Sequence, residues 1–274
     1  MSSFVGAIAL AAGLTLGSGC LVGVILGLIG GGGSILAVPL LVYVVGIGSA
    51  HIAIGTGATA VAFNAATSLI GHARAGTVKW RCAAVFAAAG VAGALAGSAA
   101  GKAMDGQRLL ALFGLVMMIV GLSMLRPRRA DEDAGVRLTA GTARRLIPRL
   151  AASGLVVGAL SGFFGIGGGF LIVPGLMFAT RMPLRNAIGT SLVAVSVFGV
   201  TTSASYAASG LVDWRSAILF IAGGIGGGYL GMKFGAALSN ERRALNLVFS
   251  AVVITVGLFM TGKGLVSLLA VQAL

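Results

Sequence analysis

A glycine-rich turn inside strongly apolar sequence occurs twice in this chain. The first copy reads Gly27-Leu-Ile-Gly-Gly-Gly-Gly-Ser-Ile-Leu-Ala-Val-Pro39, and the second reads Gly162-Phe-Phe-Gly-Ile-Gly-Gly-Gly-Phe-Leu-Ile-Val-Pro174. Interrupted backbone inside a membrane is tolerated only where it is buried in protein or lines a site. Two copies therefore suggest two halves that share one site.

The composition indicates a polytopic membrane protein. Of the 274 residues, 58% are hydrophobic and 9% are charged, and the mean hydropathy is +1.06. The net charge of +13 comes from Lys and Arg that lie mostly between apolar stretches, so it predicts orientation in a bilayer rather than nucleic-acid binding. The apolar run from about Phe4 follows no Lys or Arg, so we expect a membrane segment and not a cleavable signal peptide. Cys20 and Cys82 fit no metal-ligand or disulfide pattern.

The two turns belong to a longer internal repeat. Pro39 and Pro174 are 135 positions apart, and after a one-residue gap the offset settles at 134, where Thr56 matches Thr190. The same offset continues through further matched stretches, which are Gly76-x-Val78-x-Trp80-Arg81 with Gly210-x-Val212-x-Trp214-Arg215, and Gly90, Gly93, Gly97 and Gly101 with Gly224, Gly227, Gly231 and Gly235. One offset held for so long indicates a duplicated fold.

Each repeat divides into five apolar pieces. They span 4–29, 34–48, 52–73, 82–103 and 107–126 in the first repeat (1–126), and about 150–164, 169–180, 186–209, 215–236 and 243–262 in the second (150–274). Pieces three to five can cross a ~30 Å hydrocarbon core as helices, whereas the second piece reaches only about 18 to 22 Å at ~1.5 Å per residue. The first two pieces form either a hairpin with its turn inside the membrane or two tilted crossings with the turn near a face. The predicted fold class is an all-α polytopic membrane protein with two inverted repeats, each a broken-helix hairpin plus three transmembrane helices.

Loop charges support this inversion. If each broken pair returns the chain to its starting side, 14 of the 19 Lys and Arg residues lie on one side of the membrane and four on the other. If each broken pair were one crossing, the split would be 12 to 6. The positive-inside rule therefore favours inverted repeats with both termini outside and the Arg-rich linker 127–149 in the cytoplasm, in a plasma or bacterial inner membrane.

The glycine turns predict an anion site. A glycine run leaves backbone N–H groups free to face one point, and a short helix that starts at about Ser34 adds the positive end of its dipole. In the inverted repeat, the equivalent helix from about Gly169 points back at the same region, near the midplane. The candidate binding residues of the two turns are Gly30, Gly31, Gly32, Gly33 and Ser34, and Gly165, Gly167, Gly168 and Gly169.

Polar side chains on the third piece of each repeat add further candidates. These are Thr56, Thr190, Ser191, Asn64, Thr67 and Thr201, with Ser68 and Thr202 also paired by the repeat. The alternative is that the glycines permit tight helix packing and that the hydroxyls bond to their own helix. Asn64 stands near a helix centre opposite Phe198 in the repeat, and it could contact substrate or another helix.

The glycine ladders indicate close helix packing. Gly90, Gly93, Gly97 and Gly101 fall on one narrow helix face at ~100° per residue, as do their counterparts. Such a face serves the contact between the two halves or a homodimer interface. A nucleotide-binding fingerprint is excluded, because it requires a preceding strand in a βαβ unit.

Charged residues restrict the mechanism. All six acidic residues, at 105, 131–133, 213 and 241, fall in loops or at segment ends, so no buried carboxylate is available for a proton relay, for cation coordination or for an aspartyl protease. We expect no enzyme activity, no metal and no cofactor. Arg74, Arg81 and Arg185 could gather anions at a cytoplasmic vestibule, although orientation alone would also explain them.

The residues described above resemble the sulfite exporter TauE/SafE family of membrane permeases. The resemblance lies in the duplicated glycine turn that ends at Pro39 and Pro174, and in the Ala-x-Gly-Thr stretches at Thr56 and Thr190. It implies export of sulfite, sulfonates such as sulfoacetate, or related anions across the bilayer. A permease for another small organic anion, such as a carboxylate, and a non-transporting membrane assembly factor are the alternatives.

Overall fold

A computed structural model describes residues 2–125, 140–165, 169–237 and 242–272. In these ranges the regular elements are all helical: α1 (Ser2–Ile29), the 3₁₀ helix η1 (Gly30–Leu36), α2 (Ala37–Tyr43), α3 (Ala50–Arg74), α4 (Trp80–Ala103), α5 (Gly106–Leu125), α6 (Ala140–Phe164), α7 (Gly169–Thr180), α8 (Leu184–Ala207), α9 (Trp214–Ala237) and α10 (Arg242–Gln272). Seven of the described helices are long and apolar enough to cross a membrane. The predicted all-α polytopic fold class is confirmed.

The observed bounds differ from the predicted spans mainly at two helices. α6 begins at Ala140, ten residues before the predicted start, and α10 continues to Gln272, ten residues past the predicted end. The early turns of α6 are helical although they are rich in Arg, because Leu146 and Leu150 lie four residues apart on one buried face. Part of the predicted 127–149 linker is thus the first portion of α6, and the predicted linker residues 127–139 lie outside the described residues.

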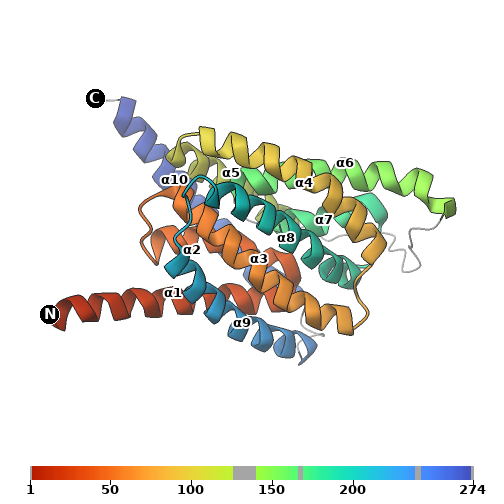
Figure 1. Ribbon diagram of the computed structural model, residues 1–274, viewed down its shortest axis with the longest axis horizontal. Helices are drawn as coiled ribbons and strands as arrows, with labels where there is room; N and C mark the ends of the chain where they lie inside the picture. Colours follow the sequence, from red (N-terminus) through yellow and green to blue (C-terminus); the bar gives the residue numbers. More distant parts are fainter. Residues whose placement is uncertain (1, 126–139, 166–168, 238–241, 273–274) are drawn as a thin grey trace.

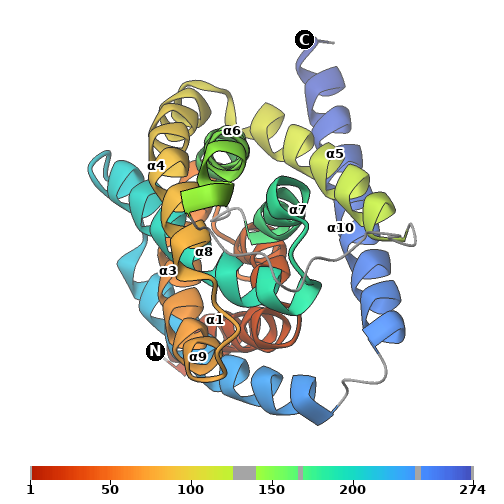
Figure 2. The ribbon, with the colours of Figure 1, turned by 90° about the vertical axis from the view of Figure 1, so that its right-hand side faces the viewer.

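Six long helices form two sets that run in opposite directions (Figures 1 and 2). α1, α3 and α9 are parallel to one another, since Gly23 contacts Gly224 and Gly27 contacts Gly228, while Asn64 of α3 also lies against Gly224. α4, α6 and α8 form the second set, as the contact between Gly158 and Gly90 illustrates. α3 and α8 are antiparallel, because Gly55 lies beside Tyr206 whereas Gly199 lies beside Ala62.

The two sets are built from matching members of the two repeats. α1 packs on α9 as α6 packs on α4, and α3 packs on both α8 and α9 as α8 packs on both α3 and α4. α5 packs antiparallel to its counterpart α10, with Gly114 beside Gly257 and Gly121 beside Ile254. Equivalent helices therefore run in opposite directions. The orientation of the repeats across a bilayer stays a prediction, which these directions favour.

The glycine ladders make the contact between the halves. A methyl group on Gly93 or Gly97 would overlap carbonyls of α6, and one on Gly227 or Gly231 would overlap carbonyls of α1. Backbones in direct contact leave no room for a Cβ atom. Of the two roles expected for these faces, the internal contact is the one observed.

Each helix break lies where the first helix of a repeat ends. Gly27, just before the first break, contacts Gly228 of α9, and Phe163, just before the second, contacts Gly101 of α4. Because α9 and α4 run in opposite directions, the breaks are displaced toward opposite ends of the bundle. The broken segments are still neighbours, since η1 packs against both α7 and α8.

Candidate functional site

The first break is a 3₁₀ helix rather than an open turn. Gly30, Gly31, Gly32 and Gly33 occupy its start, and the following α-helix begins at Ala37, three residues later than the predicted start at about Ser34. Gly33 packs directly on the backbone of Leu26, and a Cβ at this position would lie 2.5 Å from that residue's amide nitrogen. Glycine is thus required for the break to fold back on α1. The side chain of Ser34 is fully buried.

The second break turns at a glycine in the left-handed region. Gly165 has a φ of 64° and lies against Ile54 of the first repeat, so a side chain there would be both strained and obstructed. Gly169 begins α7 and is buried. Gly167 and Gly168 lie outside the described residues, so convergence of the free N–H groups on one point stays a prediction.

Thr56 and Thr190 connect the two repeats. The Thr56 hydroxyl accepts a hydrogen bond from the backbone N–H of Asp213 at 2.9 Å, and the Thr190 hydroxyl accepts one from the backbone N–H of Lys79 at 3.0 Å. Both threonines are fully buried. Each hydroxyl thus satisfies an amide beside the first turn of α9 or α4, where no helical carbonyl is available. This cross-repeat role was not foreseen from the sequence, although the matched Ala-Ile-Gly-Thr stretches identified the residues.

Three other predicted hydroxyls bond to their own helices. Thr67 donates to the carbonyl of Asn64, Thr201 donates to the carbonyl of Val197, and Ser191 donates to the carbonyl of Ile188. This is the bonding that the packing alternative expects. Each hydroxyl uses its one O–H donor in this bond, so contact with an anion would require that bond to break, and substrate contact at these residues stays a prediction.

Asn64 is one of five described residues whose buried side-chain polar atoms lack a hydrogen-bond partner; the others are Ser161, Thr202, Tyr206 and Ser250. The side chain of Asn64 is 1% exposed, and neither its Nδ2 nor its Oδ1 atom has a hydrogen-bond partner. It lies directly against Gly224 of α9, in the way that Phe198, its repeat counterpart, lies against Gly90 of α4. The sequence left open a hydrogen bond from the Asn64 amide to another helix, and the structure shows no such bond. A buried amide without partners is costly, and it calls for a ligand, a water molecule or a change of conformation.

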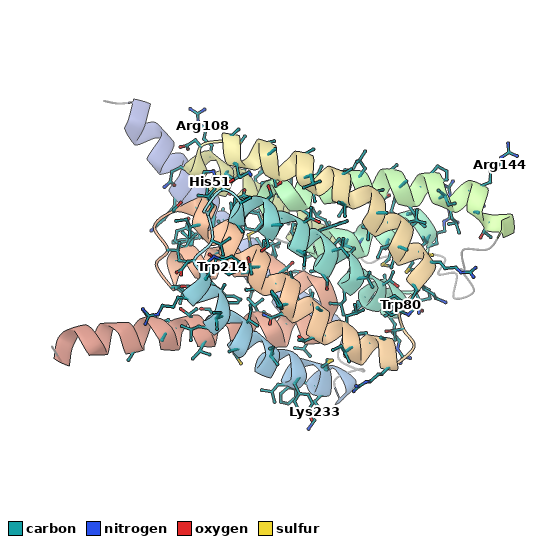
Figure 3. The ribbon with its side chains drawn as sticks, in the orientation of Figure 1. His51, Trp80, Arg108, Arg144, Trp214 and Lys233 are labelled. Carbon is teal, nitrogen blue, oxygen red and sulfur yellow. The ribbon has the colours of Figure 1, made fainter. Side chains whose placement is uncertain are left out.

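The three predicted vestibule arginines lie at one end of the bundle. Arg74 ends α3, whereas Arg81 and Arg185 begin α4 and α8, which run the opposite way. Figure 3 shows Arg144, at the start of α6, and Trp80 at this same end, with His51, Arg108 and Trp214 at the other. We refer to the end that holds Arg74, Arg81, Arg144 and Arg185 as the Arg-rich end.

Acidic residues are kept out of the described helix interiors. Asp105 and Asp213 precede α5 and α9, where their carboxylates accept hydrogen bonds from backbone N–H groups of the first turn. Among the described residues, no cluster of three His, Cys, Asp or Glu side chains could hold a metal ion. The interior therefore offers amides, hydroxyls and glycine backbone as its polar groups.

A polar contact between α4 and α8 was missed in the sequence. Lys102 donates to the carbonyl of Ser205 and to the hydroxyl of Ser209, both at 3.0 Å, while the hydroxyl of Ser98 donates to that of Ser205 at 2.9 Å. Ser98 and Lys102 are four residues apart, which places them on one helix face. That spacing was a usable signal, but the partner helix was not evident from it.

A family model and several relatives match this chain. The model of a family described as "Sulfite exporter TauE/SafE" matches residues 15–260. A "Probable membrane transporter protein" of Xylella fastidiosa (strain 9a5c) is 53% identical over 257 residues, which cover 94% of this chain and 97% of the relative. The "Probable membrane transporter protein YunE" of Bacillus subtilis (strain 168) is 28% identical over 271 residues, which cover 91% of this chain and 97% of that relative. No solved structure matches the chain significantly.

Proposed function

The chain belongs to the sulfite exporter TauE/SafE family of membrane transporters, and from this premise we propose that it exports small sulfur-containing anions, such as sulfite and short sulfonates, from the cytoplasm. The observation that carries the proposal is the packing of the two broken segments, η1 and α7, in a bundle whose described helices contain no Asp or Glu. Broken helices at the contact of two repeats are the usual place of a transporter's substrate site. An interior without carboxylates favours an anion over a cation.

The proposed orientation places the Arg-rich end in the cytoplasm of a bacterial cell, with the protein in the inner membrane and both termini outside. The described basic residues at the Arg-rich end outnumber those at the opposite end, which are Lys102, Arg108, Arg215 and Lys263. The positive-inside rule supports this orientation. Arg74, Arg81 and Arg185 would then raise the local concentration of anions at the entrance.

The proposed substrate contacts are the glycine segments and the amide of Asn64. Backbone N–H groups of η1 and of the start of α7 are neutral donors that suit an oxyanion. The side-chain Nδ2 of Asn64 has no partner and is available as a further donor. A negative charge held only by neutral donors can leave again, because no fixed cation retains it.

The membrane potential is sufficient to drive this export. One elementary charge that leaves down ~100 mV releases about 2.3 kcal/mol. At ~1.4 kcal/mol for each factor of ten, this supports a roughly fiftyfold outward gradient without a coupled ion. We therefore expect electrogenic transport.

Efflux from proteoliposomes tests the proposal. Vesicles are loaded with labelled sulfite, sulfoacetate or acetate, and the potential is set with potassium and valinomycin. We expect sulfite or sulfoacetate efflux that is faster when the potential drives anions out, and little acetate efflux. Preferred acetate efflux would indicate a carboxylate permease, absence of any flux would support an assembly role, and electroneutral proton-linked flux would contradict the electrogenic mechanism.

A further inference from the structure

A cavity lies at the end of the bundle opposite the Arg-rich end. It has a volume of about 280 Å³ and is formed where α2 ends, α3 and α5 begin, and α10 passes by. Tyr43, Gln107 and Lys263 provide its polar groups, and Val42, Ala50 and Leu110 contribute apolar wall. None of these residues belongs to the glycine segments or to the Asn64 contact. The cavity is thus separate from the site proposed above.

The cation of this cavity is held by aromatic rings rather than by a carboxylate. The ammonium of Lys263 lies 5.5 Å from the ring centroid of Tyr43 and 5.2 Å from that of Phe259. These two rings pack edge to face at 5.2 Å. Cation–π contacts keep the ammonium beside the two rings, and the N–H donors that point away from the rings can bond an anion.

The carboxylate at the start of α5 is already engaged. Asp105 caps α5, where its Oδ1 accepts hydrogen bonds from the backbone N–H groups of Gln107 and Arg108, each at 3.1 Å. In the part of the chain that the structure describes, no ion pair joins Lys263 to a carboxylate. Lys263 is the charged residue among those that line the cavity, so the lining itself is positive.

We propose that this cavity is a second anion site, which binds a small organic anion with a sulfonate or carboxylate head group and a short hydrocarbon part. Lys263 pairs with the head group, and the amide of Gln107 and the hydroxyl of Tyr43 are further donors beside it. Val42, Ala50 and Leu110 cover the hydrocarbon part, so a propyl sulfonate binds more tightly than sulfite, which cannot use the apolar wall.

The position of the cavity gives it a role in release. This assignment rests on the proposed direction of export, under which the end opposite the Arg-rich end faces outward. An anion that leaves the interior then passes to Lys263 before it enters bulk water. The same site binds anions supplied from outside, which makes it a point of inhibition by external sulfonates.

Binding to purified protein in nanodiscs tests the site. The probes are 1-propanesulfonate, sulfite and the uncharged dimethyl sulfone, measured by isothermal titration calorimetry in zwitterionic lipid. Lys263→Gln is the test variant. Lys233→Gln is the matched control, because the ammonium of Lys233 also lies over a tyrosine ring, that of Tyr229 at 4.7 Å, but Lys233 is not among the residues that line this cavity.

We expect the wild type to bind propanesulfonate more tightly than sulfite and dimethyl sulfone not to bind. Lys263→Gln should weaken propanesulfonate binding about tenfold, since a charge pair near a protein surface contributes up to several kcal/mol before screening. Lys233→Gln should change the affinity less than twofold. Equal affinity in the wild type and Lys263→Gln overturns the proposal.

Two further measurements separate this site from its alternatives. If phosphatidylglycerol in the nanodiscs displaces propanesulfonate at low mole fraction, the cavity is a lipid head-group site and the proposal is wrong. If the wild type shows no efflux of any anion while the contrast between Lys263→Gln and Lys233→Gln persists, the transport function fails and the anion site stands. If efflux occurs and external propanesulfonate inhibits both variants equally, the release role is refuted.

Discussion

Replacement of Asn64 by Leu should stabilise the protein and impair its transport. Leu has the same number and branching of side-chain heavy atoms as Asn, and it carries no polar atoms. In the described structure both amide atoms of Asn64 lie buried without partners. An unsatisfied buried polar group costs about 1–3 kcal/mol, and an apolar replacement of the same shape removes that cost.

The expected gain can be expressed as a melting temperature. Relief of one of the two unpaired amide atoms alone gives a stabilisation of about 1–3 kcal/mol. At roughly 3 °C per kcal/mol for a chain of this size, Tm should rise by about 3 to 9 °C. Efflux of sulfite from proteoliposomes should fall at least tenfold, because the interior loses the amide donor proposed to contact the substrate.

Phe198→Leu is the matched control, since Phe198 occupies the equivalent position of the second repeat. Its ring stacks on Phe86 with centroids 6.0 Å apart, so the same replacement residue there should destabilise by about 1–3 kcal/mol. Thermal unfolding of both variants in detergent gives the comparison. A lower Tm for Asn64→Leu would mean that its amide is satisfied in the native state, and wild-type efflux would mean that it does not contact substrate. Either result would refute the reasoning.

Two further predictions concern the contacts between the repeats. Thr56→Val and Thr190→Val should each destabilise by about 1 kcal/mol, because each leaves a partly buried backbone N–H without its acceptor. Chemical denaturation should show similar losses, and a neutral effect of either would contradict the cross-repeat role. Gly227→Ala should lower Tm by several degrees, because its methyl group would overlap the carbonyl of Cys20, whereas Gly226→Ala, with open space around it, should leave Tm unchanged. Equal Tm values for the two alanine variants would show that the α1–α9 contact can relax.

The helices that cross the bundle could be predicted from the sequence, because the lengths of the apolar stretches and their repetition can be read directly from it. The span predicted as about 169–180 has the same bounds as α7, and the glycine ladders identified helix faces that do pack closely. The spacing of the glycines did not show which helices these faces pack against. A face of small residues indicates close approach without naming its partner, and here the partner is the first helix of the other repeat.

The site was less predictable than the fold. Thr56 was identified by its repetition, but its role depends on an amide of Asp213 that is 157 positions away and becomes its neighbour only in the folded chain. The start of α6 was missed because its Arg residues resemble a loop, although Leu146 and Leu150 bury a helical face there. The short helix after the first break was expected from about Ser34, yet the glycine run forms a tight 3₁₀ turn against α1 and the α-helix begins only at Ala37.

The pairing of α1 with α9 has a consequence for biogenesis. Gly19 lies against Phe220, so α1 can make this contact only after α9, about 200 residues later in the chain, has been synthesised. At roughly 5–20 residues per second, translation leaves α1 in the lipid without that neighbour for about 10 to 40 s. During this interval the glycine face of α1 is exposed to other helices in the membrane. We therefore expect the insertion machinery to bind and shield α1 until α9 has been synthesised.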